Sequence, residues 1–293
     1  MSQDPIVNLV EQQEWLQPVQ EAGENFVKAA YSAAGDAGQP IKNALHGVWL
    51  KHPLHAAITD VPIGSWTAAA VLDVLEASGK DEYAAGADAA IAVGLVGAIG
   101  AAATGLTDWS DTYGKTQRVG ALHGLLNLGA AVLYGTSYAL RKSGNRGVGR
   151  ALGFAGFATV LASAYLGGAL SYEQRVGVNH APDADEDLPQ DFTEVCAESE
   201  LTEGAAKRVE ANGKPVLLVK RENQVFALAE TCSHAGGPLS EGKIEGDTVT
   251  CPWHGSQFCL RDGRVLKGPA TIPQPALEVQ TRDGQVLVRA RKS

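Results

Sequence analysis

Cysteine and basic residues are both scarce in this sequence of 293 residues. It contains only 4 cysteines, too few for the dense disulfide framework of small secreted domains, which favours a reducing compartment. Lysine and arginine number 24 against 33 acidic residues, giving a net charge of −9. Proteins that bind nucleic acid need a basic surface to meet the phosphates, so we expect no nucleic-acid partner. The N-terminal stretch MSQDPIVNLV matches neither a secretory signal nor a twin-arginine address.

Two of the cysteines stand close to histidines in one stretch, TCSHAGGPLSEGKIEGDTVTCPWHGSQF, residues 231–258. Cys232 is followed by His234, and Cys251 is followed by His254. Thiolate and imidazole together suit a tetrahedral zinc ion as well as an iron–sulfur cluster. A common zinc finger keeps its cysteines in one knuckle and its histidines in another, whereas here each loop supplies one of each. In a two-iron centre with two histidine ligands, each loop can give one ligand to each iron.

The pattern C-x-H followed by C-x-x-H resembles the motif of the Rieske [2Fe–2S] family, and the resemblance extends over residues 191–293. It implies a [2Fe–2S] cluster with the two cysteines of the motif on one iron and its two histidines on the other. Ser256 is implied as a hydrogen-bond donor to the cluster. The pair Gly268-Pro269 resembles the loop that covers such clusters. A zinc ion in the same pocket remains the alternative.

The sequence departs from the quinol-oxidising Rieske proteins of respiratory complexes at three positions. Gly237 and Trp253 stand where those proteins carry two bridging cysteines, and Phe258 replaces a tyrosine near the cluster. Hydrogen bonds to the sulfurs raise the potential, so fewer donors predict a value in the lower half of the roughly −150 to +300 mV range. The remaining cysteines, Cys196 and Cys259, are expected to stay reduced.

Around the motif the chain has the alternation typical of β-strands. Runs such as KPVLLVK and QVFALAE are separated by turn signals, among them Asn212-Gly213 and Asp283-Gly284. Short strands at this frequency predict a small sandwich or barrel. The two loops of the motif then meet at one end of the domain, near its surface.

Long apolar windows occupy the earlier part of the chain. Three carry no charged residue, over 89–107, 119–140 and 151–172, and a weaker one that contains Asp60 covers 52–72. Each is close to the ~20 residues that cross a bilayer as a helix. A soluble bundle is the alternative, although soluble helices show a polar face at their helical period. We expect four spans, because an even number returns the chain to its starting side.

The stretch HGVWLKHPLHAAITDVPIGSWT, together with GLTDW and YLGGALSYEQRVGVN, resembles an uncharacterised bacterial family of four-helix membrane domains. The resemblance implies a fold but gives no biochemical activity. Before it, a single amphipathic helix is expected from Val7 to Ala34, with Trp15, Leu16 and Phe26 on its apolar face.

The expected fold is multi-domain, an all-α transmembrane four-helix bundle followed by an all-β Rieske domain. Its parts are an amphipathic helical segment over 1–44, the membrane domain over 45–179, an acidic linker over 180–190 and the Rieske domain over 191–293.

Basic residues near the span ends are equally numerous on the two sides, so the positive-inside rule does not decide the orientation. The lack of an export signal and of a disulfide framework favours the cytoplasm for both termini. We therefore expect a multi-pass protein of the cytoplasmic (inner) membrane whose Rieske domain faces the cytoplasm.

A Rieske cluster by itself carries single electrons. Ring-hydroxylating oxygenases need a further iron site with two histidines and a carboxylate, and no histidine follows His254. The sequence therefore favours a membrane-anchored, ferredoxin-like electron-transfer protein rather than the catalytic subunit of an oxygenase. Its expected partners are redox donor and acceptor proteins and the lipid bilayer, and a homo-oligomer is compatible. The alternatives are a quinone- or haem-linked oxidoreductase and a redox-sensing or anchoring module.

Two histidines, His55 and His123, fall inside the expected spans. Ionisable groups in spans usually point inward and serve a function. The pair predicts a b-type haem or quinone site, with His52, Asp60 and Asp108 as nearby polar groups. The alternative is that both histidines are hydrogen-bonded side chains that help helices pack.

Overall fold

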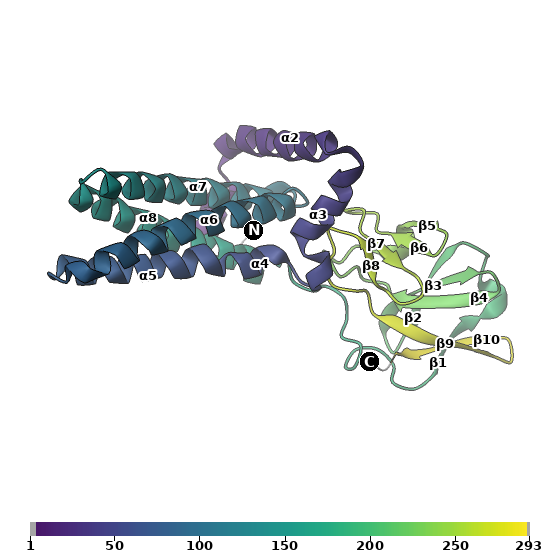
Figure 1. Cartoon of the computed structure of the whole chain (residues 1–293). Helices are drawn as coiled ribbons and strands as arrows, with labels where there is room; N and C mark the ends of the chain where they lie inside the picture. The colour runs from purple at the N-terminus through teal and green to yellow at the C-terminus, as the bar shows by residue number, and fades with distance from the viewer. Residues whose placement is uncertain (1–3, 292–293) are drawn as a thin grey trace. The chain divides into compact units, whose positions relative to one another are not determined.

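The structure is a computed structural model that describes residues 4–291, and the chain forms two compact units. The helical unit consists of Met1–Gly38 and Leu54–Val176. The second unit consists of Gln39–Pro53 and Gly177–Ser293 and contains the strands, drawn in green and yellow in Figure 1. The segment Gln39–Pro53 therefore groups with the strands, although it precedes the apolar helices in the chain.

The helical unit is built from α-helices joined by short turns. Its α-helices are α1 (Pro5–Glu11), α2 (Gln17–Ala33), α4 (Leu54–Ile58), α5 (Asp60–Ala77), α6 (Ala84–Trp109), α7 (Gly114–Lys142) and α8 (Arg146–Gly168). Short 3-10 turns lie at Glu14–Leu16, Gly35–Ala37 and Asp81–Tyr83, and a π-helical turn at Ala169–Glu173 follows α8.

Within residues 4–291, four helical stretches are long and apolar enough to cross a membrane, as judged by length and composition. They are Leu54–Ala77, Asp81–Trp109, Gly114–Lys142 and Arg146–Glu173. The prediction of an all-α part with four apolar spans is confirmed. The helices extend beyond the expected uncharged windows, because polar residues at their ends continue the same backbone hydrogen bonds.

The prediction of a single helix from Val7 to Ala34 is wrong, because the chain forms α1 and then α2 there. Pro18 lies in the first turn of α2, where its missing N–H costs no hydrogen bond, so a new helix begins at this point. Trp15 and Phe26, expected on the apolar face of that helix, are exposed by 57 % and 65 %.

The first span is interrupted at Thr59, between α4 and α5. Pro62 lies in the first turn of α5 and has no N–H to donate to the carbonyl of Ile58, four residues before it. The hydrogen-bond ladder is therefore broken at this point, which explains why one apolar stretch forms two helices.

Glycines let the long helices approach one another closely. Trp66 of α5 stacks on Tyr134 of α7, with ring centroids 4.3 Å apart and an interplanar angle of 11°. A Cβ at Gly94 of α6 would collide with the Trp66 indole, and one at Gly156 of α8 would lie 3.0 Å from the Tyr134 ring. One residue from each long helix thus meets at this level, in agreement with small residues at helix interfaces in lipid.

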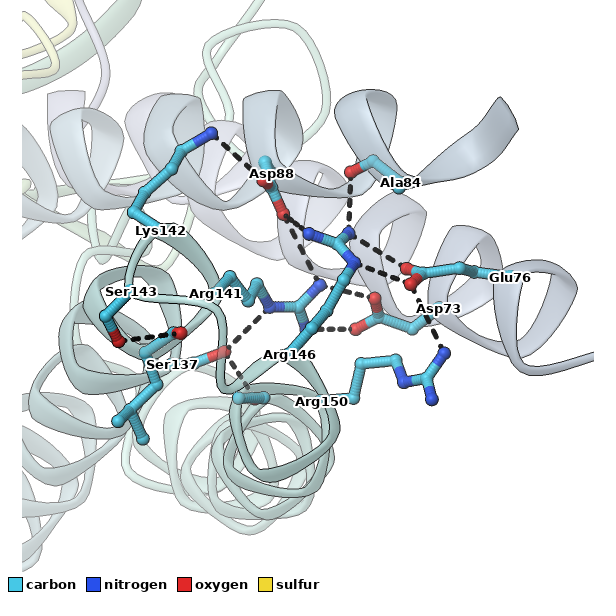
Figure 2. A network of polar contacts seen from close by, with 12 residues as sticks. Asp73, Glu76, Ala84, Asp88, Ser137, Arg141, Lys142, Ser143, Arg146 and Arg150 are labelled. Atoms are coloured by element: carbon cyan, nitrogen blue, oxygen red, sulfur yellow. Dashed lines mark hydrogen bonds and ion pairs between the residues drawn. The ribbon is translucent and has the colours of Figure 1, made fainter. Parts of the chain in front are cut away.

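Charged side chains join the same helices where α5 and α7 end and α6 and α8 begin (Figure 2). Arg146 of α8 donates to both oxygens of Glu76 on α5, at 2.5 and 2.8 Å. It also donates to Asp88 of α6 at 2.9 Å. Arg141 of α7 pairs with Asp73 of α5 and lies 3.7 Å from Asp88. The network therefore ties the α5–α6 hairpin to the α7–α8 hairpin.

The second unit contains two antiparallel sheets, with strand orders β1-β10-β9-β4-β3-β2 and β5-β6-β7-β8. Their bounds are β1 (Thr193–Ala197), β2 (Ala206–Ala211), β3 (Lys214–Arg221), β4 (Gln224–Ala229), β5 (Lys243–Glu245), β6 (Thr248–Thr250), β7 (Gln257–Cys259), β8 (Val265–Lys267), β9 (Ala276–Arg282) and β10 (Gln285–Ala290). The helix α3 (Gly38–His46) and a 3-10 turn at Val48–Leu50 precede the first span. The predicted all-β domain is confirmed.

Strand β3 separates two buried clusters. Val216 and Leu218 point into one, while Leu217 and Val219 point into the other, because successive side chains of a strand face opposite sides. The second cluster also contains Cys232. The candidate metal ligands are therefore supported directly by the domain core.

The acidic stretch expected as a linker, 180–190, lies wholly within the second unit. Leu188 is 1 % exposed and belongs to the first of the two clusters. The next residue, Pro189, accepts a hydrogen bond from Ala290 N at 2.6 Å. Asp183 and Asp185, earlier in the stretch, are exposed.

Candidate functional site

The first donor loop follows β4 and is closed by its own backbone. Cys232 N donates to Gly237 O at 2.9 Å, and Gly236 N donates to Cys232 O at 2.9 Å. Gly236 adopts a φ of +81°, a left-handed conformation that strains other side chains. This turn leaves Cys232 buried while His234 stays partly exposed.

The second donor loop follows β6 and has the same construction. Cys251 N donates to Ser256 O at 2.8 Å, and Gly255 N donates to Cys251 O at 3.1 Å. Gly255 supplies the positive φ of this loop, +71°. Cys251 is buried and His254 is partly exposed, so each loop presents one buried thiol and one accessible imidazole.

A glycine allows the two loops to meet. A Cβ at Gly237 would lie 3.0 Å from Cys251 Sγ and 3.0 Å from Trp253 Cγ. Gly237 and Trp253 are the positions that correspond, by the family resemblance, to bridging cysteines of respiratory proteins. They are neighbours here as well, and the loops are joined by packing instead of a disulfide.

The four donors form two pairs, the thiols together and the imidazoles together. The rings of His234 and His254 are 4.7 Å apart between centroids, at 85° to one another. A hydrogen bond from the Cys232 thiol lowers the pKa of Cys251 to about 7 and raises that of Cys232. One thiolate is thus available near neutral pH, and thiolate is the form that binds metal. Two paired thiols and two paired imidazoles on the same two loops fit a two-iron cluster with different ligands on its two irons, whereas within residues 4–291 no group of three or more such donors lies close enough to hold a single metal ion.

A loop after β8 supports the second donor loop. Ala270 N donates to Ser256 Oγ at 2.9 Å, and Ser256 is fully buried. Because this oxygen already accepts a hydrogen bond, its proton is free to point toward another acceptor. Ala270 belongs to the same buried cluster as the two cysteines of the donor loops. Ser256 is therefore suitably placed for the hydrogen-bonding role that the sequence predicts, which stays a prediction.

Gln274 supports the first donor loop and was not identified from the sequence. It is 1 % exposed, donates to Ala229 O at 2.7 Å and to Thr231 O at 2.6 Å, and accepts from Ser233 N at 3.0 Å. Ser233 Oγ donates to Ile272 O at 2.7 Å in the same place. An amide in the apolar run ATIPQPALEV was the available signal, since a buried amide must satisfy its donors and acceptor.

Glu230, which directly follows β4, holds the segment after the first donor loop in place. Its carboxylate accepts from Ser240 N at 3.0 Å and also from the Ser240 hydroxyl. Burial raises the pKa of Glu230, and the hydrogen bonds from Ser240 oppose that shift. The contact closes the segment that begins at Thr231 and includes the first donor pair.

The two histidines of the candidate spans bond to neighbouring helices. Nδ1 of His55, on α4, lies 3.0 Å from Ala101 O of α6, and Nδ1 of His123, on α7, lies 2.8 Å from Ser163 O of α8. A carbonyl oxygen only accepts, so both Nδ1 atoms carry a proton. Nε2 of His123 is engaged by the Asn127 amide at 3.1 Å.

The remaining groups expected around this pair are only partly assembled. His55 and His123 interact electrostatically, and Asp108 interacts with His55. Asp60 is exposed and does not join them, and His52 groups with the second unit. The sequence placed them together by spacing alone, which does not determine the direction of a side chain.

Comparisons with known proteins match the two halves of the chain separately. Residues 191–281 match the family described as Rieske [2Fe-2S] domain, and residues 51–180 match the family described as Predicted membrane protein (DUF2231). Ferredoxin CarAc of Metapseudomonas resinovorans is 36 % identical over 106 residues, which are 36 % of this chain and 99 % of that ferredoxin. The ferredoxin component of biphenyl 2,3-dioxygenase of Rhodococcus jostii (strain RHA1) is 36 % identical over 97 residues, 33 % of this chain and 91 % of its own length.

Among solved structures, the complex of reduced oxygenase and oxidized ferredoxin in carbazole 1,9a-dioxygenase contains a chain with 34 % identity. The match covers 36 % of this chain and 97 % of that one, with a TM-score of 0.34.

Proposed function

The chain belongs to the Rieske [2Fe–2S] domain family through its strand-containing unit, and on this basis we propose that it is a membrane-anchored electron carrier. Cys232 and Cys251 hold one iron of its cluster. His234 and His254 hold the other. When bound, the cluster accepts and releases one electron at a time. Cys232 and Cys251 are buried and His234 and His254 are partly exposed, so the imidazoles would be the accessible ligands.

The grouping of the donors carries this proposal. On two loops that glycines allow to touch, the two thiols lie close together, one of them prone to ionise, and the two imidazoles lie close together. The thiols are buried in the core and the imidazoles are partly exposed, so electrons enter and leave by way of the histidine side. Trp253, next in the chain to His254 and 55 % exposed, adds an apolar contact for a docking protein there.

The partners in this proposal are redox proteins. One relative is the ferredoxin component of a dioxygenase, which supports an oxygenase as electron acceptor. A single-electron carrier also needs a donor, for which we propose a second redox protein.

The way in which the second unit is assembled supports a shared side of the membrane for its two segments. Residues 39–53 and 177–293 belong to one unit, so they lie on the same side of the membrane. Four spans between them, an even number, meet this requirement. We place that side in the cytoplasm, since Cys196 and Cys259 are free thiols. Reporter fusions at residue 293 that are active only outside the cell would contradict this orientation.

For His55 and His123 we propose a packing role. A bis-histidine haem requires a free ring nitrogen on each ligand, but Nδ1 of His123 bonds Ser163 and Nε2 bonds Asn127. The residues present therefore do not fit a haem. A quinone headgroup needs only a hydrogen-bonding partner, so a quinone site at His55 is the second candidate.

Metal and sulfide analysis tests the proposed function. Purified full-length protein should contain iron and acid-labile sulfide in equal amounts, and Cys251→Ser should lose both. Cys196→Ser, which changes a thiol outside the donor loops, serves as the control and should keep them. Purified protein that contains zinc and no sulfide would contradict the iron–sulfur cluster and support a tetrahedral zinc site instead.

A further inference from the structure

The helix α3 lies outside both regions matched by known families. Those regions cover residues 51–180 and 191–281, whereas α3 spans Gly38–His46. The alignment with ferredoxin CarAc accounts for 99 % of that protein, so α3 is an addition relative to it. Nevertheless residues 39–53 group with the strands of the second unit.

Asn43 of α3 bonds to the loop that carries Ala270. Its Oδ1 accepts from Gly268 N at 3.0 Å, and its Nδ2 is 3.4 Å from Leu266 O, a weak bond at that length. Gln39 Nε2 donates to the same Oδ1 at 2.8 Å and so holds the Asn43 amide in this orientation. One side chain thus binds the backbone on both sides of Lys267.

His46, one turn further along α3, packs against the same glycine. It is 1 % exposed, and a Cβ at Gly268 would lie 3.0 Å from His46 Cδ2. A larger residue at position 268 would therefore require the ring to shift by a few tenths of an ångström. Asn43 and His46 therefore fix Gly268 by a hydrogen bond and by close packing together.

Two residues after Gly268, the loop reaches the donor site. Ala270 N donates to Ser256 Oγ, and Ser256 belongs to the second donor loop, which also contains Cys251 and His254. Any movement of Gly268 changes the position of the Ala270 amide, and with it the acceptor geometry at the Ser256 hydroxyl. The contacts form a continuous path from α3 to the donor loop.

We propose that Asn43 and His46 are positioning residues for the iron–sulfur centre. They hold the Gly268–Ala270 loop, which orients the Ser256 hydroxyl toward the cluster and so keeps the potential higher than in a domain without α3. The proposal rests on the proposed function, because it requires a cluster. Hydrogen bonds to cluster sulfurs raise the potential, so a loosened loop lowers it.

A redox titration of the full-length holoprotein tests the effect on potential. Asn43→Ala and His46→Ala should each shift the midpoint potential downward, and Ser256→Ala should shift it further. Asn43→Asp keeps the acceptor for Gly268 N and should shift it less than Asn43→Ala. Asn8→Ala, on α1 of the helical unit, is the control and should leave it unchanged.

A double-mutant comparison tests the path itself. If Asn43 acts through Ser256, Asn43→Ala should add no further shift in the Ser256→Ala background, because residues in one network are not additive. A full additional shift there overturns the path, and an unmoved potential in Asn43→Ala overturns the proposal.

Hydrogen exchange of the Gly268 amide gives a measurement that does not depend on the cluster. Its protection should fall in Asn43→Ala and be largely retained in Asn43→Asp. Wild-type protein without a cluster would contradict the proposed function. Wild-type protein with a cluster, but with Gly268 exchange equal in wild type and Asn43→Ala, contradicts the role of α3 alone.

Discussion

Arg141 donates two hydrogen bonds to Asp73, at 2.6 and 2.5 Å, and both side chains are essentially excluded from solvent, at 0 % and 2 % exposure. The two residues come from α7 and α5, so the pair joins two hairpins of the helical unit. Ser137 Oγ accepts a third bond from the same guanidinium, at 3.1 Å. A buried cation with this many bonds depends on its partner, and the partner depends on it.

Arg141→Ala should therefore destabilise the helical unit by about 3–5 kcal/mol, since it leaves the Asp73 carboxylate buried and unpaired. Unfolding of the purified protein in a denaturing detergent measures this. The neighbouring Lys142 is the matched control, because its side chain is 54 % exposed although it also pairs with an acid. Lys142→Ala should change stability by less than about 1 kcal/mol. Equal losses in the two variants contradict a special role for the buried pair.

Gln274→Leu should weaken the first donor loop. The substitution removes two donors and one acceptor that bind the backbone at Ala229, Thr231 and Ser233, and each buried group left without a partner costs about 1–3 kcal/mol. We expect a lower thermal stability and a smaller amount of bound iron per chain. Gln280→Ala, an exposed glutamine on β9, is the control. Full iron content in Gln274→Leu would show that the loop holds its shape without the amide.

The helical unit should become less stable at acidic pH because the Glu24 carboxylate becomes protonated. A hydrogen bond from Gln117, at 2.6 Å, lowers the pKa of this carboxyl below its usual 4.5. Because the folded pKa is depressed, the stabilisation is complete above pH 4.5 and is lost as the pH falls through the folded pKa. This contribution of Glu24 to the free energy of unfolding is below about 1 kcal/mol, since such surface groups are screened by solvent.

Glu24→Gln should flatten this part of the profile of unfolding free energy against pH, measured downward from pH 6 in about half-unit steps. Glu21→Gln, on the exposed side of the same helix, is the control. A profile that is identical in wild type and Glu24→Gln contradicts the assignment.

His123→Ala should lower stability without changing any absorption spectrum, because its ring serves to satisfy Ser163 and Asn127 across α8 and α7. A loss of about 1–3 kcal/mol is expected for the buried partners left behind. His52→Ala, outside the helical unit, is the control. A haem absorption band in the wild type that vanishes in both His55→Ala and His123→Ala would overturn the packing role. Quinone-dependent reoxidation of the cluster that is lost in His55→Ala alone would establish the quinone site.

Local patterns were enough to predict the spans, the strands and the donor loops. The length of an apolar stretch predicts a span, and alternation of apolar and polar residues predicts a strand. The motif formed by Cys232 and His234 lies within a single turn, so it can be recognised locally. The supporting groups depend on contacts between distant parts of the chain. Asn43 and Gly268 are separated by 225 positions, and no spacing rule reaches that far. The role of Gln274 could not be predicted for the same reason, because its hydrogen-bond partner Ala229 lies far from it in the chain.

The two-part composition of the second unit also sets an order of assembly during synthesis. Residues 39–53 leave the ribosome before the four spans, whereas residues 177–293 leave after them. The unit cannot be completed until the last of these helices has been made, because its strands and all four metal-donor residues lie in the second segment. Assembly of the donor site therefore follows synthesis of the four apolar helices, so a chain that stalls before their end carries no complete set of donors.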